Sequence, residues 1–141
     1  MEMNFQSVDG FRAPARPLRV FLVEDVAAVR ERIIESLTEN AALEVAGFAE
    51  TEEGALSWLG RNACDVLILD LELRRGNGLG LLKSMASLDT PPQPVTIVYS
   101  NHVSANIRRL AAQFGAAYFI DKTLDGHKLR PLLEQLSAAP A

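Results

Sequence analysis

Acidic, hydroxyl and basic side chains directly follow short apolar runs of the sequence. Glu24 and Asp25 follow the first run, Asp70 and Ser100 follow two later runs, and Lys122 lies just beyond the last. Each residue type alone has an ordinary structural role, since acids and serines often cap helices and loop lysines are usually solvated. Together, three neighbouring carboxylates would repel one another unless a cation lay among them. The set therefore indicates a site for a positive ion.

The chemistry of such a site follows from its ligand types. Carboxylate oxygens suit Mg²⁺, which keeps part of its water shell and bridges to phosphate oxygens. One carboxylate can then act as the nucleophile that forms an aspartyl phosphate. A lysine and a hydroxyl would hold the remaining phosphate oxygens, because phosphoryl transfer depends mostly on positioning and charge neutralisation. These residues predict magnesium-assisted phosphoryl transfer to a carboxylate.

Five short apolar runs are predicted to be the strands that position these residues. Most of their residues are β-branched, aromatic or leucine, and they span residues 18–23, 43–48, 66–69, 95–99 and 117–120. Four runs are apolar nearly throughout, which is typical of strands that are buried on both faces of a parallel sheet. The run 43–48 alternates between apolar and polar residues and is expected at an edge.

Segments of helical periodicity separate the predicted strands. Apolar stripes run through residues 26–37 and 103–114, and Thr51 is expected to cap a helix between them. Residues 75–78 form a turn signal before another helix, and regular helix is expected to begin near Lys128 after a looser entry.

Five strands that alternate with five helices predict an α/β fold, a (βα)5 doubly wound sheet of five parallel strands. Right-handed crossovers place the helices of such a fold on both faces of the sheet. Ligands of open parallel sheets bind beyond the carboxyl ends of the strands. The acids, the serine and the lysine are therefore expected to converge on one edge of the sheet.

Four strings of the sequence resemble the receiver domain of two-component response regulators. They are VFLVED at 20–25, DVLILD at 65–70, VYS at 98–100 and FIDK at 119–122, and the resemblance covers roughly residues 18–136. It implies the flavodoxin-like strand order 2-1-3-4-5.

The resemblance assigns the chemistry to particular residues. Asp70 would accept a phosphoryl group from a phosphohistidine on a sensor histidine kinase or a histidine phosphotransfer protein. Asp25 would bind Mg²⁺ directly, Glu24 would bind it mostly through water, and the backbone carbonyl of Glu72 would be a further ligand.

The resemblance also implies a switch. Lys122 matches the lysine that pairs with the phosphate, Ser100 the hydroxyl that turns toward it, and Phe119 the switch aromatic, for which simple core packing is the alternative. Phosphate on the acceptor would draw Ser100 inward, vacate space for Phe119 and reshape the face made by the fourth helix, fifth strand and fifth helix. Downstream proteins would dock on that face.

Several positions depart from the usual pattern of the family. Arg74 and Thr123 stand where proline is usual, four residues after the phosphoacceptor and directly after the lysine. Asn101 stands where a small residue is usual and narrows access to the phosphoacceptor. Glu72 and His102 occupy variable positions at which family members tune the hydrolysis of the aspartyl phosphate. No departure removes a catalytic group.

Composition sets further limits. The 141 residues include 18 acids and 14 bases, and the formal charge of −4 argues against binding to a phosphate backbone. The sequence shows neither a signal peptide nor a membrane segment, so a cytoplasmic location is expected. The single cysteine, Cys64, is expected to be a buried structural thiol.

We expect a flexible arm at 1–17, a receiver domain at 18–137, a tail at 138–141 and no output domain.

The leading hypothesis is a stand-alone response regulator that catalyses only its own phosphorylation and dephosphorylation and signals through protein contacts. A receiver-like adaptor that acts without phosphate is one alternative, motivated by the departures from the family pattern. An aspartate-nucleophile phosphatase is another, because Asp70-Leu71-Glu72 resembles the Asp-x-Asp of haloacid-dehalogenase-like enzymes. The sequence does not name the cognate kinase, the pathway or the downstream target. Phosphorylation-dependent homodimers through Arg108 and Arg109 are also left undecided.

Overall fold

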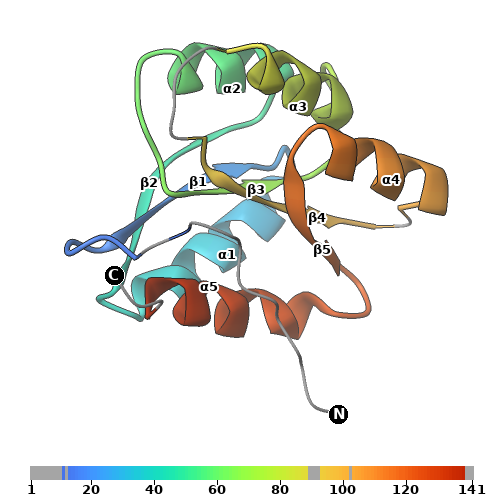
Figure 1. The fold of residues 1–141 in the computed structure, drawn as a ribbon. Coiled ribbons are helices and arrows are strands. Elements are labelled where there is room, and N and C mark those ends of the chain that lie inside the picture. Colours follow the sequence, from blue (N-terminus) through green and yellow to red (C-terminus); the bar gives the residue numbers. More distant parts are fainter. Residues whose placement is uncertain (1–10, 12, 89–92, 102, 139–141) are drawn as a thin grey trace.

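A computed structural model describes residues 11, 13–88, 93–101 and 103–138. It contains one sheet of five parallel strands in the order β2-β1-β3-β4-β5, which confirms the predicted fold (Figure 1). The strands are β1 (Leu18–Val23), β2 (Leu43–Ala49), β3 (Val66–Leu69), β4 (Val95–Ser100) and β5 (Ala116–Asp121). The helices are α1 (Ala27–Thr38), α2 (Glu52–Leu59), α3 (Gly78–Ala86), α4 (Ala105–Gln113) and α5 (Leu129–Ser137), with a 3₁₀ turn η1 (Gly126–Lys128) before α5.

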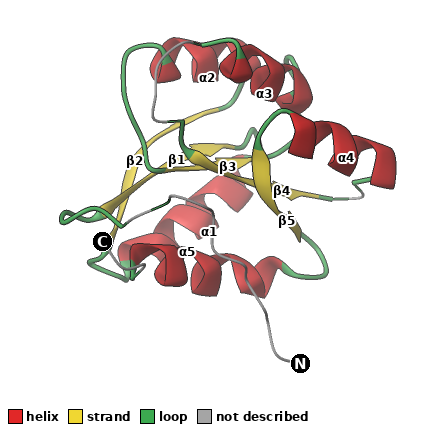
Figure 2. Cartoon of the chain, in the orientation of Figure 1, coloured by secondary structure: helices red, strands yellow, loops and turns green. Residues whose placement is uncertain are grey.

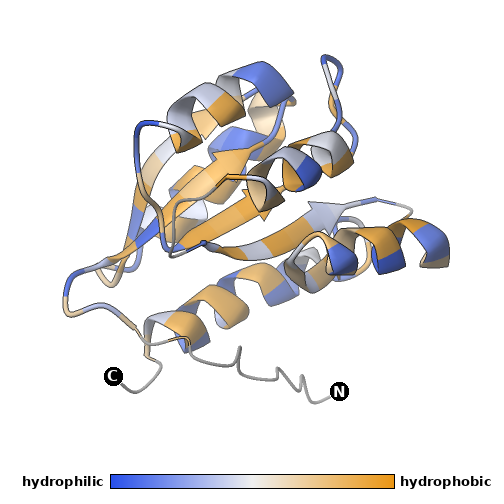
Figure 3. Cartoon of the chain, turned by 45° about the horizontal axis from the view of Figure 1, so that its top comes forward, coloured by the Kyte–Doolittle hydropathy of each residue, from blue (hydrophilic) through white to orange (hydrophobic). Residues whose placement is uncertain are grey.

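Helices cover both faces of the sheet. Helices α1 and α5 lie on one face, and α2, α3 and α4 lie on the other (Figures 1 and 2). Alternate residues of each strand enter separate cores, so Leu22 and Ile68 pack on the side of α1 and α5, whereas Phe21 and Leu69 pack on the opposite side. The central strands are accordingly the most hydrophobic part of the chain (Figure 3).

The two edge strands differ from the buried centre. Strand β2 lies at an edge of the sheet as predicted, and Leu43 and Ala49 at its two ends are buried whereas Phe48 is exposed. The expectation of continuous burial was wrong for β5, in which Ala117 is exposed and Phe119 is only half-buried. Strand β5 forms the second edge of the sheet and has a neighbour on one side only, so apolar composition alone overstated its burial.

Side-chain caps start three of the helices at the carboxyl edge. Thr51 accepts a hydrogen bond from the backbone N–H of Gly54 at 3.0 Å, as predicted. Asn77 and Ser104 cap α3 and α4 in the same way. Pro131 falls in the first turn of α5, where its missing N–H costs little, and η1 provides the looser entry that the sequence predicted.

Residues ahead of β1 contact the folded domain. The guanidinium of Arg16 donates to both carboxylate oxygens of Asp65, at 2.7 and 3.2 Å, and the backbone N–H of Arg19 donates to the same carboxylate at 2.7 Å. Phe11 packs against the core under α1 and α5. Residues 1–10 and 12 of the proposed arm, residues 139–141 of the proposed tail, and His102 lie outside the described residues. Within the described part of the chain, no helix is long and apolar enough to cross a membrane.

Candidate phosphorylation site

The carboxyl edge of the sheet brings together the side chains that the sequence singled out. Glu24 and Asp25 follow β1, Asp70 follows β3, Ser100 ends β4 and Lys122 follows β5. Because β1, β3 and β4 are neighbours in the sheet, the acidic pair and the serine flank Asp70 on either side. One ligand oxygen from each of the three acids lies within 4.8 Å of the other two. The predicted convergence is therefore confirmed.

Asp70 is held through both of its carboxylate oxygens. Its Oδ1 accepts hydrogen bonds from the hydroxyl of Ser100 at 2.8 Å and from the backbone N–H of Glu72 at 2.9 Å. Its Oδ2 accepts a hydrogen bond from the ammonium of Lys122 at 2.7 Å. Asp70 is only 5% exposed and Ser100 is fully buried, so little of the acceptor carboxylate reaches solvent. The hydroxyl of Ser100 thus points at the carboxylate of Asp70 itself.

Lys122 links two of the three acids. Its Nζ lies 2.7 Å from Asp70 Oδ2 and 2.5 Å from Glu24 Oε1. Burial alone would lower the pKa of the Lys122 ammonium, but its hydrogen bonds and attraction to Asp70 and Glu24 outweigh burial and raise that pKa above its usual value. The side chain is therefore charged at neutral pH and offsets part of the negative charge of the cluster.

The acidic pair is fixed by backbone groups. Glu24 is 1% exposed, and its Oε2 accepts a hydrogen bond from the N–H of Val26 at 3.1 Å. Asp25 Oδ2 accepts a hydrogen bond from the backbone N–H of Arg74 at 2.6 Å. A proline at position 74 would have no N–H to donate. This departure from the family pattern thus adds a contact between the β1–α1 and β3–α3 loops.

Arg30 of α1 is a positioning residue that sequence reasoning missed. Its Nη1 donates to the backbone carbonyl of Glu24 at 3.0 Å, its Nη2 lies 3.0 Å from Glu50, and its guanidinium lies over the ring of Phe48. The side chain thereby joins the carboxyl ends of β1 and β2. Its signal in the sequence was an arginine one helical turn after Val26, on the apolar face of the predicted helix.

The loop after Asp70 is held against the start of α2. Glu52 accepts a hydrogen bond from the N–H of Asn77 at 2.9 Å, and its own N–H donates to the carbonyl of Arg75 at 3.3 Å. Gly76 has a φ of +82°, which favours glycine. A Cβ at Gly78 would lie 2.5 Å from the backbone oxygen of Asp70, so the start of α3 can approach the phosphoacceptor closely only without a side chain there.

The two remaining departures contact each other. Thr123 Oγ1 donates a hydrogen bond to Asn101 Oδ1 at 2.7 Å. Asn101 and the exposed Glu72 also line a cavity of about 380 Å³ that reaches Ser100. Two of the three predicted tuning residues, Glu72 and Asn101, thus lie next to Ser100, and the third, His102, lies outside the described residues.

The predicted switch aromatic lies next to Ser100. Phe119 is half-buried in β5, and the guanidinium of Arg108 lies 5.1 Å from the centre of its ring. Both residues line a cavity of only about 30 Å³ that Ser100 also borders. Phe119 is therefore packed against the core and next to the predicted switch hydroxyl at the same time.

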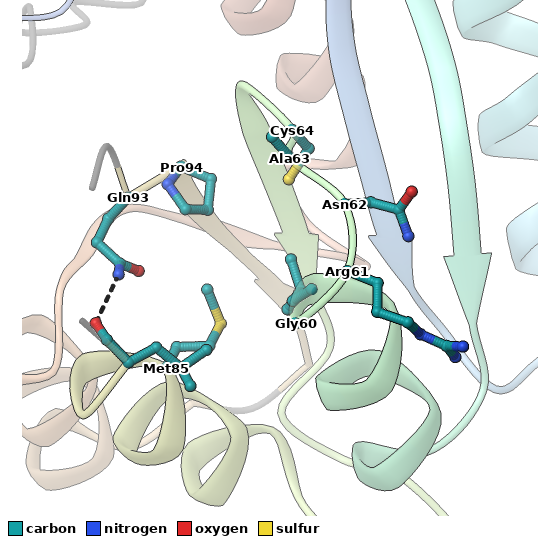
Figure 4. A pocket seen from close by; sticks show the side chains of 10 residues that line it. Gly60, Arg61, Asn62, Ala63, Cys64, Met85, Gln93 and Pro94 are labelled. Atoms are coloured by element: carbon teal, nitrogen blue, oxygen red, sulfur yellow. Dashed lines mark hydrogen bonds between the residues drawn. The ribbon is translucent and has the colours of Figure 1, made fainter. Parts of the chain in front are cut away.

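A third cavity lies at the opposite edge of the sheet. It measures about 310 Å³, and its lining includes Cys64, Met85 and Pro94 (Figure 4). Cys64 precedes β3 and Pro94 precedes β4, which places this cavity at the amino ends of the strands. Burial is the main cause that raises the pKa of the free Cys64 thiol to about 12. A protonated thiol is a poor nucleophile, which agrees with the expected structural role, but Cys64 is half-buried and not fully buried as predicted.

Comparisons with known proteins agree with this geometry. The response regulator receiver domain model matches residues 20–134. The chain is 35% identical over 130 residues to a protein-glutamate methylesterase/protein-glutamine glutaminase of Halalkalibacterium halodurans, covering 87% of this chain and 37% of that protein. It is 33% identical over 108 residues to protein-glutamate methylesterase/protein-glutamine glutaminase 2 of Saccharophagus degradans, covering 76% and 30%. The chain thus spans about a third of the length of these relatives.

Solved structures give the same family. The non-phosphorylated HemR receiver domain from Leptospira biflexa superposes with a TM-score of 0.75 at 27% identity, covering 88% of this chain and 97% of that one. The response regulator domain of Thermotoga maritima CheB superposes with a TM-score of 0.75 at 26% identity, covering 88% and 96%. With its strand order, its acidic edge and the matched residues 20–134, the chain belongs to the response regulator receiver domain family.

Proposed function

We propose that this receiver domain is a phosphorylation switch whose phosphoacceptor is Asp70. The donor would be a phosphohistidine on a sensor histidine kinase or a histidine phosphotransfer protein. One observation carries the proposal: the buried carboxylate of Asp70 accepts hydrogen bonds from Ser100 and Lys122 and lies within 4.8 Å of ligand oxygens of Glu24 and Asp25. Phosphoryl-aspartate and Mg²⁺ are typical of the family to which the chain belongs.

The transfer requires little covalent chemistry from the protein. A carboxylate oxygen of Asp70 attacks phosphorus, the new O–P bond forms, and the P–N bond to the donor histidine breaks with its electrons returning to the imidazole. The hydroxyl of Ser100 and the ammonium of Lys122 already contact the acceptor. They can therefore hold the phosphoryl oxygens as these arrive, and positioning of this kind contributes most of the catalysis in phosphoryl transfer.

The donor set suits Mg²⁺. Glu24, Asp25 and Asp70 supply hard carboxylate oxygens close enough to share one ion. The backbone carbonyl of Glu72 is proposed as a further ligand. When bound there, Mg²⁺ supplies charge neutralisation for the transferred phosphoryl oxygens. Lys122 supplies a second positive charge from the protein itself.

The output would follow through the β5 edge. Phe119 and Ser100 border the same small cavity, and α4 and α5 flank β5 on opposite faces of the sheet (Figure 1). The Ser100 hydroxyl already donates to Asp70 Oδ1, so its transfer from that oxygen to a phosphoryl oxygen would change the space next to Phe119 and the surface around it. We propose that a downstream protein reads this surface, and that the chain catalyses only its own phosphorylation and dephosphorylation.

Phosphate incorporation from acetyl phosphate in the presence of Mg²⁺ tests the proposal. Wild-type protein is expected to take up one phosphoryl group, and Asp70→Asn is expected to take up none. Asp125→Asn is the matched control, because Asp125 is a partly exposed acid that pairs with Lys128. Label that persists in Asp70→Asn, or wild-type protein that is never labelled, would overturn the assignment. Partner binding that Asp70→Asn leaves unchanged would instead favour an adaptor.

A further inference from the structure

The hydrogen bond between Thr123 and Asn101 joins the two loops that carry the groups bound to Asp70. Asn101 directly follows Ser100, and Thr123 directly follows Lys122. Just before these residues, the backbone N–H of Lys122 donates to the carbonyl of Ser100 at 3.2 Å. The side-chain hydrogen bond, at 2.7 Å, therefore connects the β4 and β5 loops one residue farther along.

We propose that the Asn101–Thr123 hydrogen bond is a positioning contact for phosphoryl transfer. It holds the hydroxyl of Ser100 on Asp70 Oδ1 and the ammonium of Lys122 on Asp70 Oδ2 at the same time. The inference rests on the proposed role of Asp70 as phosphoacceptor. Neither Asn101 nor Thr123 contacts the reacting atoms in this scheme; each acts through the residue that precedes it.

Both ends of the contact are attached to firm structure. Asp121 Oδ1 accepts hydrogen bonds from the N–H groups of Thr123 and Leu124, at 2.9 and 2.8 Å, which fixes the loop that carries Thr123. Asn101 follows the fully buried Ser100 at the end of β4. Threonine is also stiff at χ1. A displacement of either loop would therefore break the hydrogen bond or move its partner loop.

The Asn101–Thr123 hydrogen bond restrains the loop after Lys122, at which the usual family proline is missing. A proline after the lysine would restrict the backbone of that loop through its ring but would have no N–H to donate. Thr123 instead donates its N–H to Asp121 and its hydroxyl to Asn101. Small displacements of positioning groups cause large losses in transfer rate. A hydrogen bond between the loops is thus suited to preserving the arrangement of Ser100 and Lys122 around the acceptor.

Near-isosteric substitutions test the contact. Thr123→Val and Asn101→Leu each remove one polar partner, whereas Thr123→Ser keeps the hydroxyl. We expect Thr123→Val and Asn101→Leu each to lower the rate constant of phosphorylation by acetyl phosphate at saturating Mg²⁺ by about three- to tenfold, the size of one hydrogen bond. Thr123→Ser should restore the wild-type rate, and the double variant should be no slower than the slower single variant.

A second measurement reports on position without phosphorylation. Proton exchange between the Lys122 ammonium and water, followed by NMR, is expected to be faster in Thr123→Val than in wild type and Thr123→Ser. Thr38→Val is the matched control, because Thr38 donates a hydrogen bond to Glu35 on an exposed part of α1. It should change neither the transfer rate nor the exchange at Lys122.

The outcomes separate this inference from the proposed function. Three results would overturn the positioning role while Asp70 is still labelled. These are a double variant whose loss in rate is the product of the two single losses, a wild-type rate in Thr123→Val, and a slow rate in Thr123→Ser. If wild-type protein takes up no phosphate, the proposed function fails. In that case, unchanged exchange at Lys122 in Thr123→Val would also overturn the contact as a positioning device, and faster exchange would support it.

Discussion

The backbone N–H of Arg74 donates to Asp25 Oδ2 at 2.6 Å, so the loop after the phosphoacceptor is attached to the acidic pair after β1. Arg74→Pro removes this donor, whereas Arg74→Ala keeps it. We expect Arg74→Pro to be less stable than Arg74→Ala by about 1–3 kcal/mol in urea unfolding, because the buried side chain of Asp25 loses a hydrogen bond. The Arg74 side chain is 78% exposed and 3.9 Å from Asp25, so Arg74→Ala should lie close to wild type. Equal stability of the two variants would contradict a structural role for the N–H.

Arg30 is expected to stabilise the folded protein more than a typical surface arginine does. Arg30→Met keeps much of the apolar length but loses the contacts to the Glu24 carbonyl and to Glu50. We expect a loss of about 2 kcal/mol in unfolding free energy, because hydrogen bonds to charged groups are stronger than neutral ones.

The control for Arg30 is Arg19→Met. Arg19 lies 3.7 Å from Glu44, which is 56% exposed, so this change should cost less than about 1 kcal/mol. Denaturant unfolding at neutral pH measures both variants. Similar losses of unfolding free energy in the two variants would show that the buried contacts of Arg30 contribute no more to stability than an exposed ion pair.

The Asp65 carboxylate should make stability depend on pH in acid. Burial alone would raise the pKa of Asp65, but hydrogen bonds from Arg16 and from the Arg19 N–H, with the charge of Arg16, lower it below the usual 3.8. Because the folded-state pKa is depressed, this stabilisation is present above pH 3.8 and is lost as pH falls through the folded-state pKa. The stability difference between wild type and Asp65→Asn should therefore shrink below pH 3.8. A constant difference from pH 6 to pH 2, in thermal unfolding, would contradict the ion pair.

Mg²⁺ should stabilise the folded protein if the acidic edge binds it. At a free concentration of 100 times Kd, ligand binding to the folded state adds about 2.7 kcal/mol. Thermal unfolding with MgCl₂, at ionic strength matched by NaCl, is expected to show a higher Tm for wild type and for Asp125→Asn. Asp25→Asn removes the charge of one of the three grouped acids and should lose most of the increase. If MgCl₂ raises the Tm of Asp25→Asn as much as that of wild type, the ion binds elsewhere.

The sequence determined the fold and the members of the site through simple periodicity. Apolar runs with helices between them predict parallel strands, and the carboxyl ends of parallel strands meet at one edge. Asp70, Ser100 and Lys122 were therefore predictable as neighbours, although they are far apart in the chain. The burial of β5 was less predictable, because apolar composition does not report whether a strand lies at an edge.

Tertiary structure alone decided how the loops at that edge are connected. The Arg74 N–H to Asp25 and the Thr123 hydroxyl to Asn101 are contacts between segments 49 and 22 residues apart. Their formation depends on loop conformations that have no repeating pattern in the sequence. The three positions that looked like departures from the family, Arg74, Asn101 and Thr123, are donors or acceptors in these contacts. Residue types name the groups at the site, whereas packing of the loops determines which groups hold one another in place.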